Sequence, residues 1–175
     1  MGGKCSTEEK EAIASRAVPM SAEQVASYFS GTWYEQARSK RVIFEVGCRN
    51  ATADYAVQPD GTVKITNACV RVWGQKTSAE LTGTRAHPER GVFAVSFKGK
   101  KPGGYHIMSN QGGVAVVVGN CWTTAWVLTR SARYDEAVVR AALEPFPELK
   151  DTRFVFNTQA EKGQNRRPMK RLGRT

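Results

Sequence analysis

The sequence has little of what defines several large classes of protein. Its longest uninterrupted apolar run, Val114–Val118, is far shorter than the roughly 20 residues that a membrane-spanning helix needs. The chain has two His and four Cys. No two cysteines have the Cys-x-x-Cys spacing that is typical of zinc or redox motifs. Acidic residues are also scarce, with 16 Asp and Glu against 26 Lys and Arg, which gives a formal charge of +10. No internal repeat of the solenoid or propeller kind is visible.

The remaining composition indicates one globular domain. Hydrophobic residues make up 41% and charged residues 24% of the 175 positions, which is near the average for proteins with a buried core. We divide the chain into an acylatable flexible segment (1–20), a folded part (21–159) and a polybasic disordered tail (160–175). Because the N-terminus lacks the apolar stretch of a secretory signal, we expect cytosolic residence and reduced cysteines.

Short alternating runs rich in Val, Thr, Tyr and Phe fill the region between Thr32 and Arg130. They predict eight antiparallel strands near residues 32–39, 50–58, 62–73, 79–87, 91–98, 104–110, 113–119 and 124–130. Short loops make successive strands neighbours, and one face of each strand is more apolar, so the sheet can close into an up-and-down barrel. A short helix after Ser21, an amphipathic helix after Tyr134 and a ninth strand over 154–156 complete this all-β prediction.

Several segments carry a family resemblance. Gly31, Trp33 and Tyr34 resemble the Gly-x-Trp-Tyr signature of lipocalins, and residues 125–130 resemble the Trp-x-Leu-x-Arg ending of the lipocalin barrel. Residues 50–67 look like the second hairpin of the bacterial, plant and apolipoprotein D-like branch. The resemblance covers about residues 28–158 and implies that Arg130 packs across Trp33 at the closed base of the barrel, a structural cation–π contact.

One turn departs from the family pattern. The Thr-Asp-Tyr motif between the sixth and seventh strands is replaced by Ser109-Asn110-Gln111. We therefore do not carry over to this chain the receptor contact attributed to that motif.

A barrel with an apolar inner face forms a cup for a small hydrophobic molecule, because burial of apolar surface contributes about 25 cal/mol per Å². Strand parity places the candidate ligand-binding side chains inside, with the Tyr hydroxyls and one Asn as the polar groups: Tyr55, Val57, Val63, Ile65, Asn67, Phe93, Val95, Phe97, Tyr105, Ile107, Val117, Trp126 and Leu128. The same side chains can instead fill the barrel as plain core. The predicted function is binding, transport or sequestration of a lipid, fatty acid, sterol or retinoid-like molecule, with no cofactor and no metal.

Cysteines keep a second function open. Cys48, Cys69 and Cys121 map near the open rim, where three thiols can form a disulfide or bind a soft metal or haem iron, although ordinary thiols are favoured. The resemblance to secreted relatives suggests Cys48–Cys121 as neighbours. The alternative is therefore a small lipocalin-type enzyme or a redox or haem scavenger that uses rim thiols, with Cys69 facing inward.

Catalytic motifs are lacking. His87 and His106 are the only imidazoles, and neither Gly-x-Ser-x-Gly nor His-Glu-x-x-His occurs, so we expect no enzyme and no catalytic residue. Glu35 has inward parity, and we expect it to form a structural ion pair with Arg130 or Arg85.

The first residues suggest a membrane anchor. Residues 1–6, Met-Gly-Gly-Lys-Cys-Ser, match the myristoylation pattern, with Gly2 as the acceptor and Cys5 placed for palmitoylation. Acyl chains together with the basic tail predict peripheral association with an anionic, cytoplasmic membrane face. The rival explanation of the charge is RNA or DNA binding by the tail, which would be nonspecific because residues 160–175 contain no aromatic side chain.

Overall fold

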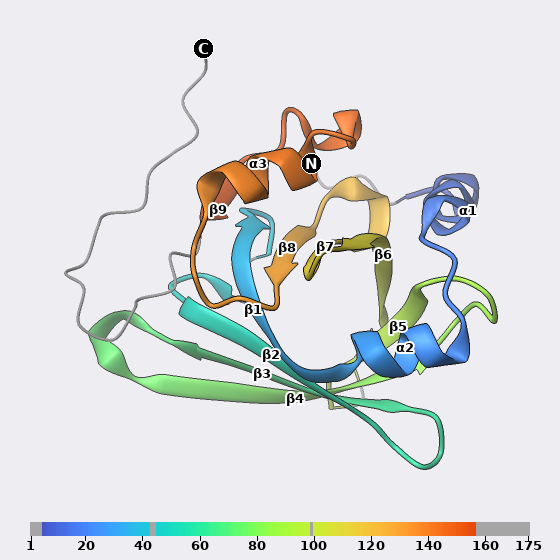
Figure 1. The fold of residues 1–175 in the computed structure, drawn as a ribbon, viewed down its shortest axis with the longest axis horizontal. Coiled ribbons are helices and arrows are strands. Elements are labelled where there is room, and N and C mark those ends of the chain that lie inside the picture. The colour runs from blue at the N-terminus through green and yellow to red at the C-terminus, as the bar shows by residue number, and fades with distance from the viewer. Residues whose placement is uncertain (1–4, 43–44, 99, 157–175) are drawn as a thin grey trace.

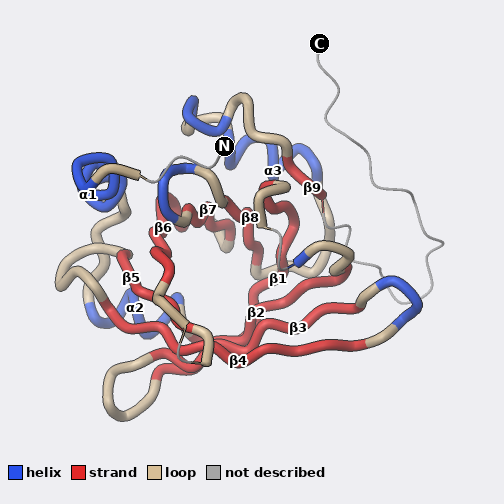
Figure 2. Tube along the Cα trace, turned by 180° about the vertical axis from the view of Figure 1, so that it is seen from behind, coloured by secondary structure: helices blue, strands red, loops and turns tan. Residues whose placement is uncertain are grey.

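The computed structural model describes residues 5–42, 45–98 and 100–156, and these form a nine-stranded antiparallel sheet that closes on itself (Figure 1; Figure 2). The strand order is β2-β3-β4-β5-β6-β7-β8-β1-β9, and pairing of β1 with β2 closes the barrel. The strands are Ser30–Ser39 (β1), Arg49–Val57 (β2), Val63–Val70 (β3), Lys76–Arg85 (β4), Val92–Ser96 (β5), Gly103–Gln111 (β6), Val114–Val118 (β7), Ala125–Thr129 (β8) and Phe154–Phe156 (β9). The helices are Thr7–Arg16 (α1), Ala22–Tyr28 (α2) and Glu136–Leu143 (α3). The predicted eight-stranded barrel with an added ninth strand is confirmed.

Hairpin pairing fixes which side chains face inward. Tyr55 on β2 lies opposite Ile65 on β3, which in turn lies opposite Leu81 on β4, so these apolar side chains share the inner face. At the β2–β3 turn, Asp60 accepts hydrogen bonds from the backbone and hydroxyl of Thr62, and Gly61 has a φ of +81°. The turn therefore sets the register of the whole hairpin.

Strand β1 changes its facing pattern in the middle. A bulge between Glu35 and Ala37 shifts its register against β8. As a result Trp33, Glu35 and Arg38 point into the barrel, whereas Ala37 joins the core on the outer side of the sheet.

Two hydrophobic clusters lie on the two faces of the sheet. The inner cluster fills one end of the barrel, and the outer cluster lies between strands β6–β9 and the helices α1 and α3 (Figure 1). Val139 of α3 is fully buried there, which fits the amphipathic pattern predicted for that helix.

Helix α1 corrects the expectation of a flexible segment over 1–20. Ser6 and Glu9 form a reciprocal capping box, and Ile13 is buried in the outer cluster. The Arg16 guanidinium lies 4.9 Å from the ring centroid of Trp122 and also pairs with Glu148. These contacts order the segment from Cys5 onward. Gly2 lies outside the described residues, as does the predicted tail over 160–175.

Candidate functional site: the barrel interior

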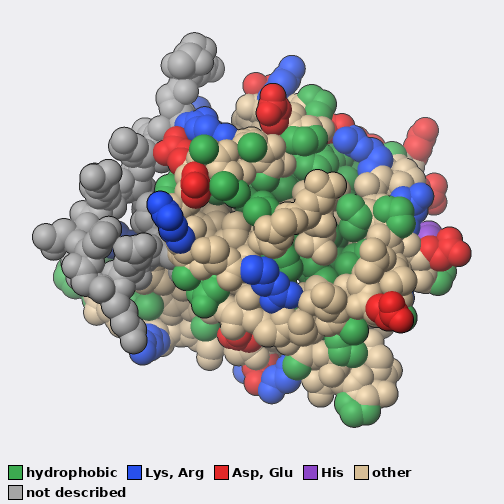
Figure 3. Space-filling view, in the orientation of Figure 1, with side chains coloured by type: hydrophobic (Ala, Val, Ile, Leu, Met, Phe, Trp, Pro, Cys, Tyr) green, Lys and Arg blue, Asp and Glu red, His purple; other side chains and the backbone are tan. Residues whose placement is uncertain are grey.

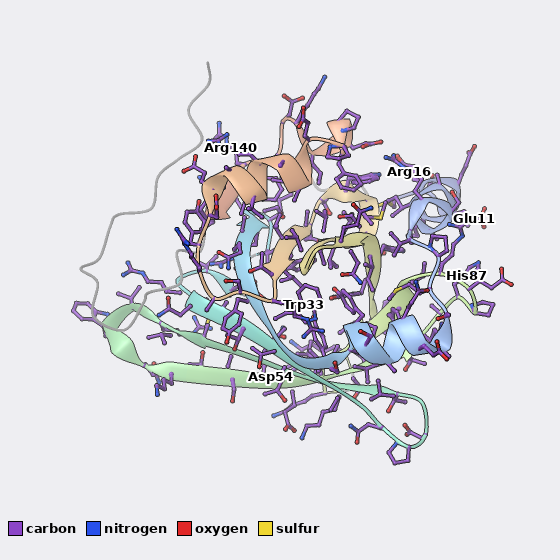
Figure 4. All side chains as sticks on the ribbon, viewed as in Figure 1. Glu11, Arg16, Trp33, Asp54, His87 and Arg140 are labelled. Carbon is purple, nitrogen blue, oxygen red and sulfur yellow. A yellow bond between two sulfur atoms is a disulfide. The ribbon has the colours of Figure 1, made fainter. Side chains whose placement is uncertain are left out.

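The closed base is built on Trp33, which lies inside the barrel at the start of β1 (Figure 4). The Trp33 indole donates a hydrogen bond of 2.9 Å to the carbonyl of Tyr28, and the Arg130 guanidinium lies 4.1 Å from the Trp33 ring centroid. Arg130 also donates to the carbonyls of Ser27, Tyr28, Ser30 and Thr32. The packing of Arg130 across Trp33, expected from the resemblance, is therefore present, and it closes this end of the barrel.

Three tyrosines form the floor above this base. The Tyr105 hydroxyl lies 2.8 Å from that of Tyr28 and 2.9 Å from that of Tyr55. Phe29 and Phe93 pack edge-to-face beside them, with ring centroids 4.5 Å apart. Burial raises the pKa of Tyr55 to about 12 and raises the pKa values of Tyr28 and Tyr105 well above their usual range. The floor is thus a neutral, solid aromatic layer.

An ionic group lies nearer the mouth. Arg38 Nη1 donates to Glu35 Oε1 at 2.5 Å, and Arg38 Nε lies 3.8 Å from Glu45 Oε2. Arg38 Nη2 donates to the carbonyls of Glu45 and Cys48, so all three guanidinium nitrogens are engaged. The expectation that Glu35 pairs with Arg130 or Arg85 is wrong, because the β1 bulge turns Arg38 inward beside it.

Glu45 brings a second carboxyl group into this ionic group. Its side chain accepts a hydrogen bond of 3.3 Å from the indole of Trp126. Burial, followed by the neighbouring Glu35 carboxylate, raises the pKa of Glu45 to about 9. Glu35 and Glu45 both contribute to the raised pKa of Tyr55, which places them in the same interior as the tyrosine floor.

The apolar side chains of the upper interior are incompletely buried. Leu81, Val95 and Trp126 face inward and pack against the inner cluster, yet they are only partly buried. Small side chains, such as Ala53, face the same space. The inward-facing side chains of Leu81, Val95 and Trp126 therefore stay partly accessible above the tyrosine floor of the closed barrel.

Asn67 places one unused polar atom among these side chains. Asn67 pairs with Ala53 on β2 and with Ala79 on β4. It is the next inward-facing residue of β3 after Ile65, on the side toward the mouth of the barrel. Its Oδ1 is buried and has no hydrogen-bond partner among the described residues. A buried acceptor without a partner is costly, so a donor group entering the barrel would be stabilised at this atom.

The predicted lining residues divide into three groups. Those that belong to the floor or the buried inner cluster are Tyr55, Val63, Ile65, Phe93, Tyr105, Ile107, Val117 and Leu128. Asn67, Val95 and Trp126 face inward above the floor and are only partly buried, although Asn67 Oδ1 itself is buried. Phe97 follows the end of β5 at the mouth, where the ammonium groups of Lys98 and Lys100 each lie 5.7 Å from its ring centroid.

Val57 does not line the interior. It is 43% exposed because the β2–β3 hairpin extends past the base of the barrel (Figure 1). Among the signature residues, Gly31 has the positive φ of +64° that favours glycine, and Tyr34 is half-buried on the alternate face of β1 from Trp33.

The expectation of reduced cysteines is wrong, whereas the alternative of a disulfide among the rim cysteines is present as Cys48–Cys69. Cys48 is bonded to Cys69, and Cys5 is bonded to Cys121, so all four cysteines are in disulfides. The three rim thiols do not converge, because Cys121 lies between β7 and β8 beside α1 instead of at Cys48. A disulfide-bonded Cys5 cannot carry a palmitoyl thioester, and the suggested Cys48–Cys121 pair is not formed.

Other parts of the described chain offer no comparable site. His106 is buried on the outer side of β6, where burial lowers its pKa and its Nδ1 lies 3.1 Å from the Val118 carbonyl oxygen. No group of three or more His, Cys, Asp or Glu side chains in residues 5–42, 45–98 and 100–156 could hold a metal ion. A pocket of about 240 Å³ on the outer surface is lined by residues of β2–β4 that include Lys76 and Ser78.

The surface charge is dispersed over the face seen in Figure 3. Lys and Arg side chains are scattered among Asp and Glu side chains there, without one continuous basic patch. None of the described helices is long and apolar enough to cross a membrane.

Comparison with known proteins agrees with this architecture. The family model of the lipocalin-like domain matches residues 24–149. The outer membrane lipoprotein Blc of Escherichia coli K12 is 31% identical over 125 residues, covering 67% of this chain and 68% of Blc. Blc of Citrobacter freundii is 32% identical over 111 residues, covering 61% and 62%. Lobster apocrustacyanin A1 shares the fold with a TM-score of 0.66 at 13% identity, covering 91% of each chain.

The names of these relatives correct the expected localisation. The similar sequences from Escherichia coli and Citrobacter freundii are outer membrane lipoproteins, which contradicts the expected residence on a cytoplasmic membrane face. The two disulfides in the structure agree with this correction.

Sequence reasoning missed Arg38 and Glu45, the residues that give the interior its ionic group. Arg38 has outward parity in an unbroken strand, and nothing in the sequence marks the bulge before it. Glu45 lies in the β1–β2 connection, to which strand periodicity does not apply.

Proposed function

Because this chain belongs to the lipocalin family, we propose that its barrel binds a small hydrophobic molecule. The observation that carries the proposal is that the inward-facing side chains of Leu81, Val95 and Trp126 stay only partly buried above the solid tyrosine floor. A guest seated there removes apolar surface from water on both sides of the contact. The base, sealed by Arg130, leaves the opposite end of the barrel as the entrance.

The polar groups narrow the class of guest to a neutral molecule with a hydroxyl or amide donor. The Arg38 guanidinium has no free nitrogen, because Glu35, Glu45 and the Cys48 carbonyl engage all three. A carboxylate ligand would add a buried negative charge next to two carboxyl groups without gaining a cation. A hydroxyl group, in contrast, can donate to the unpartnered Oδ1 of Asn67.

Retinol and retinoate test this proposal, because they share one apolar skeleton and differ in the head group. Binding of each to the full oxidised chain is followed by quenching of tryptophan fluorescence. We expect retinol to bind at least about tenfold more tightly than retinoate at neutral pH, since an unpaired buried charge costs more than one hydrogen bond. Asn67→Ala should weaken retinol binding about fivefold, whereas Asn110→Ala, an exposed position on β6, should leave it unchanged.

The outcomes separate the two parts of the proposal. Failure of both compounds and of a neutral apolar dye to bind would overturn hydrophobic ligand binding by the barrel. Tighter binding of retinoate, or equal effects of Asn67→Ala and Asn110→Ala, would leave a binding protein but refute the assignment of its head-group preference.

We further propose that the chain acts by binding and not by catalysis. The thiol-based alternative, an enzyme or a redox or haem scavenger, depended on free rim cysteines, and these are paired in the structure. The disulfides and the outer membrane relatives also support a location outside the reducing cytosol. Rapid alkylation of the protein in its own cells tests this location, and four labelled thiols would refute it.

A further inference from the structure

Exposed apolar side chains gather at the mouth of the barrel. The described chain has five exposed large hydrophobic side chains, and three of them are Val46 (64%), Val72 (50%) and Trp73 (98%). Val46 lies in the β1–β2 connection, and the other two form the turn between β3 and β4. Both segments are at the end of the barrel opposite the base sealed by Arg130.

These segments form one continuous surface. Arg71 Nη1 donates a hydrogen bond of 3.4 Å to the Val46 carbonyl, and the Cβ position of Gly47 lies 3.8 Å from Val72 Cγ2. The Cys48–Cys69 disulfide joins the two segments covalently just behind the turn. The apolar side chains are therefore held together in a fixed arrangement.

The backbone presents Trp73 outward at a conformational cost. Trp73 has a φ of +79°, a left-handed conformation that is uncommon for a bulky residue. Hydrogen bonds from Arg71 N to the Gln75 carbonyl and from Gly74 N to the Arg71 carbonyl hold the turn. Because the Trp73 indole is 98% exposed, it contributes no packing energy to the barrel. We therefore infer that it contacts a partner outside the protein.

Basic side chains surround the apolar tip. Arg49 and Lys76 both lie opposite Val70 in the β2–β3–β4 ladder, and Arg71 directly follows Val70. All three basic residues are exposed, and no Asp or Glu occurs in residues 46–53 or 70–79. We call this surface the rim patch and define it as Val46, Arg49, Arg71, Val72, Trp73 and Lys76.

We propose that the rim patch docks the barrel mouth on the surface of an anionic phospholipid bilayer. Tryptophan favours the boundary between head groups and acyl chains, and Arg and Lys beside it complement lipid phosphates and anionic head groups. Three apolar side chains are too few for a stable protein interface, which buries about 800 Å² on each partner, but they are enough for shallow insertion into lipid. Docking in this orientation places the open end of the barrel against the bilayer, where hydrophobic molecules are dissolved.

Co-sedimentation with vesicles tests the docking without any barrel ligand. The full oxidised chain is mixed with vesicles of phosphatidylcholine alone or of phosphatidylcholine with phosphatidylglycerol. We expect binding to the anionic vesicles, and a loss of about tenfold or more in partition coefficient for Trp73→Ser. Val57→Ser is the matched apolar control, because Val57 is exposed at the opposite end of the barrel.

Charge is tested in the same way. Lys76→Gln combined with Arg71→Gln should weaken binding to anionic vesicles. Arg133→Gln is the control, because Arg133 is exposed at the opposite end of the barrel, and it should have a much smaller effect. In vesicles that carry bromine on the acyl chains, quenching should be lost when Trp73 is replaced. Equal binding by Trp73→Ser and Val57→Ser would overturn the proposal. Concentration-dependent dimerisation abolished by Trp73→Ser, without a change in vesicle binding, would assign the rim patch to a second copy instead and also overturn it.

Discussion

The guanidinium of Arg130 covers the indole of Trp33 at 4.1 Å and joins strand β8 to the start of strand β1. Four backbone carbonyls from the end of α2 and the start of β1 accept hydrogen bonds from the same guanidinium. One side chain thus closes the base of the barrel and fixes the helix next to it. The structural role of this pair can be measured separately from any ligand.

Replacing Arg130 with Lys should destabilise the protein by about 2–3 kcal/mol, because Lys keeps the charge but cannot reach four carbonyls with a planar fork. Denaturant unfolding of the two proteins measures this difference. Arg133→Lys, on an exposed segment nearby, is the control. A difference below about 0.5 kcal/mol, the usual range of a surface substitution, would contradict the proposed role of Arg130.

Glu45 should make stability fall as the pH rises. Its pKa is about 4.5 when exposed in the unfolded chain and about 9 in the barrel, so between these values the folded protein binds one more proton. The free energy of unfolding should therefore decrease as the pH rises through this window. Glu45→Gln should flatten the slope while keeping the shape of the side chain. Unfolding curves for both proteins from pH 5 to pH 9 that have the same slope would show that Glu45 titrates normally.

The tyrosine floor should resist alkali. Burial raises the pKa of Tyr55 to about 12 and raises the pKa values of Tyr28 and Tyr105 well above their usual range. We therefore expect these three phenols to ionise only when the barrel unfolds, as a single cooperative step in ultraviolet absorbance. Tyr105→Phe removes the shared hydroxyl and should cost about 1–3 kcal/mol in stability, because it leaves the other two hydroxyls without their partner. Gradual ionisation of these phenols near pH 10 in folded protein would argue against a buried floor.

The Cys5–Cys121 disulfide should hold helix α1 on the barrel. The two cysteines are 116 residues apart in sequence, so the crosslink should contribute about 5 kcal/mol by restricting the unfolded chain. Cys5→Ser should raise hydrogen exchange within Thr7–Arg16, whereas Cys48→Ser should act on the mouth near β2 and β3. Unchanged exchange in α1 after Cys5→Ser would show that Ile13 and Arg16 suffice to hold it.

Much of the barrel could be predicted from periodicity because eight strands share one apolar face and are separated by clear turns. The inward residues Ile65, Phe93 and Val117 follow strict alternation along their strands, and all three are buried. The packing of Arg130 on Trp33 came from the family resemblance. In each case the local pattern and the global fold agree.

The chemistry of the interior was less accessible from the sequence. The β1 bulge reverses parity after Glu35 and brings Arg38 inside, and alternation alone cannot show where a bulge occurs. Four cysteines allow three pairings, and spacing does not choose among them. For helix α1, the capping box of Ser6 and Glu9 was a usable signal, although the helix shows only a weak apolar stripe.

Strand β1 uses one of its edges twice. Its first half, Ser30–Tyr34, pairs with β2, and its last residues, Ala37–Ser39, pair on that side with β9. Strand β9 therefore covers backbone amide and carbonyl groups that β2 no longer reaches. Without β9, the end of β1 would expose unpaired backbone amide and carbonyl groups, to which a strand of a second molecule could add. Strand β9 therefore covers an edge that would otherwise favour self-association.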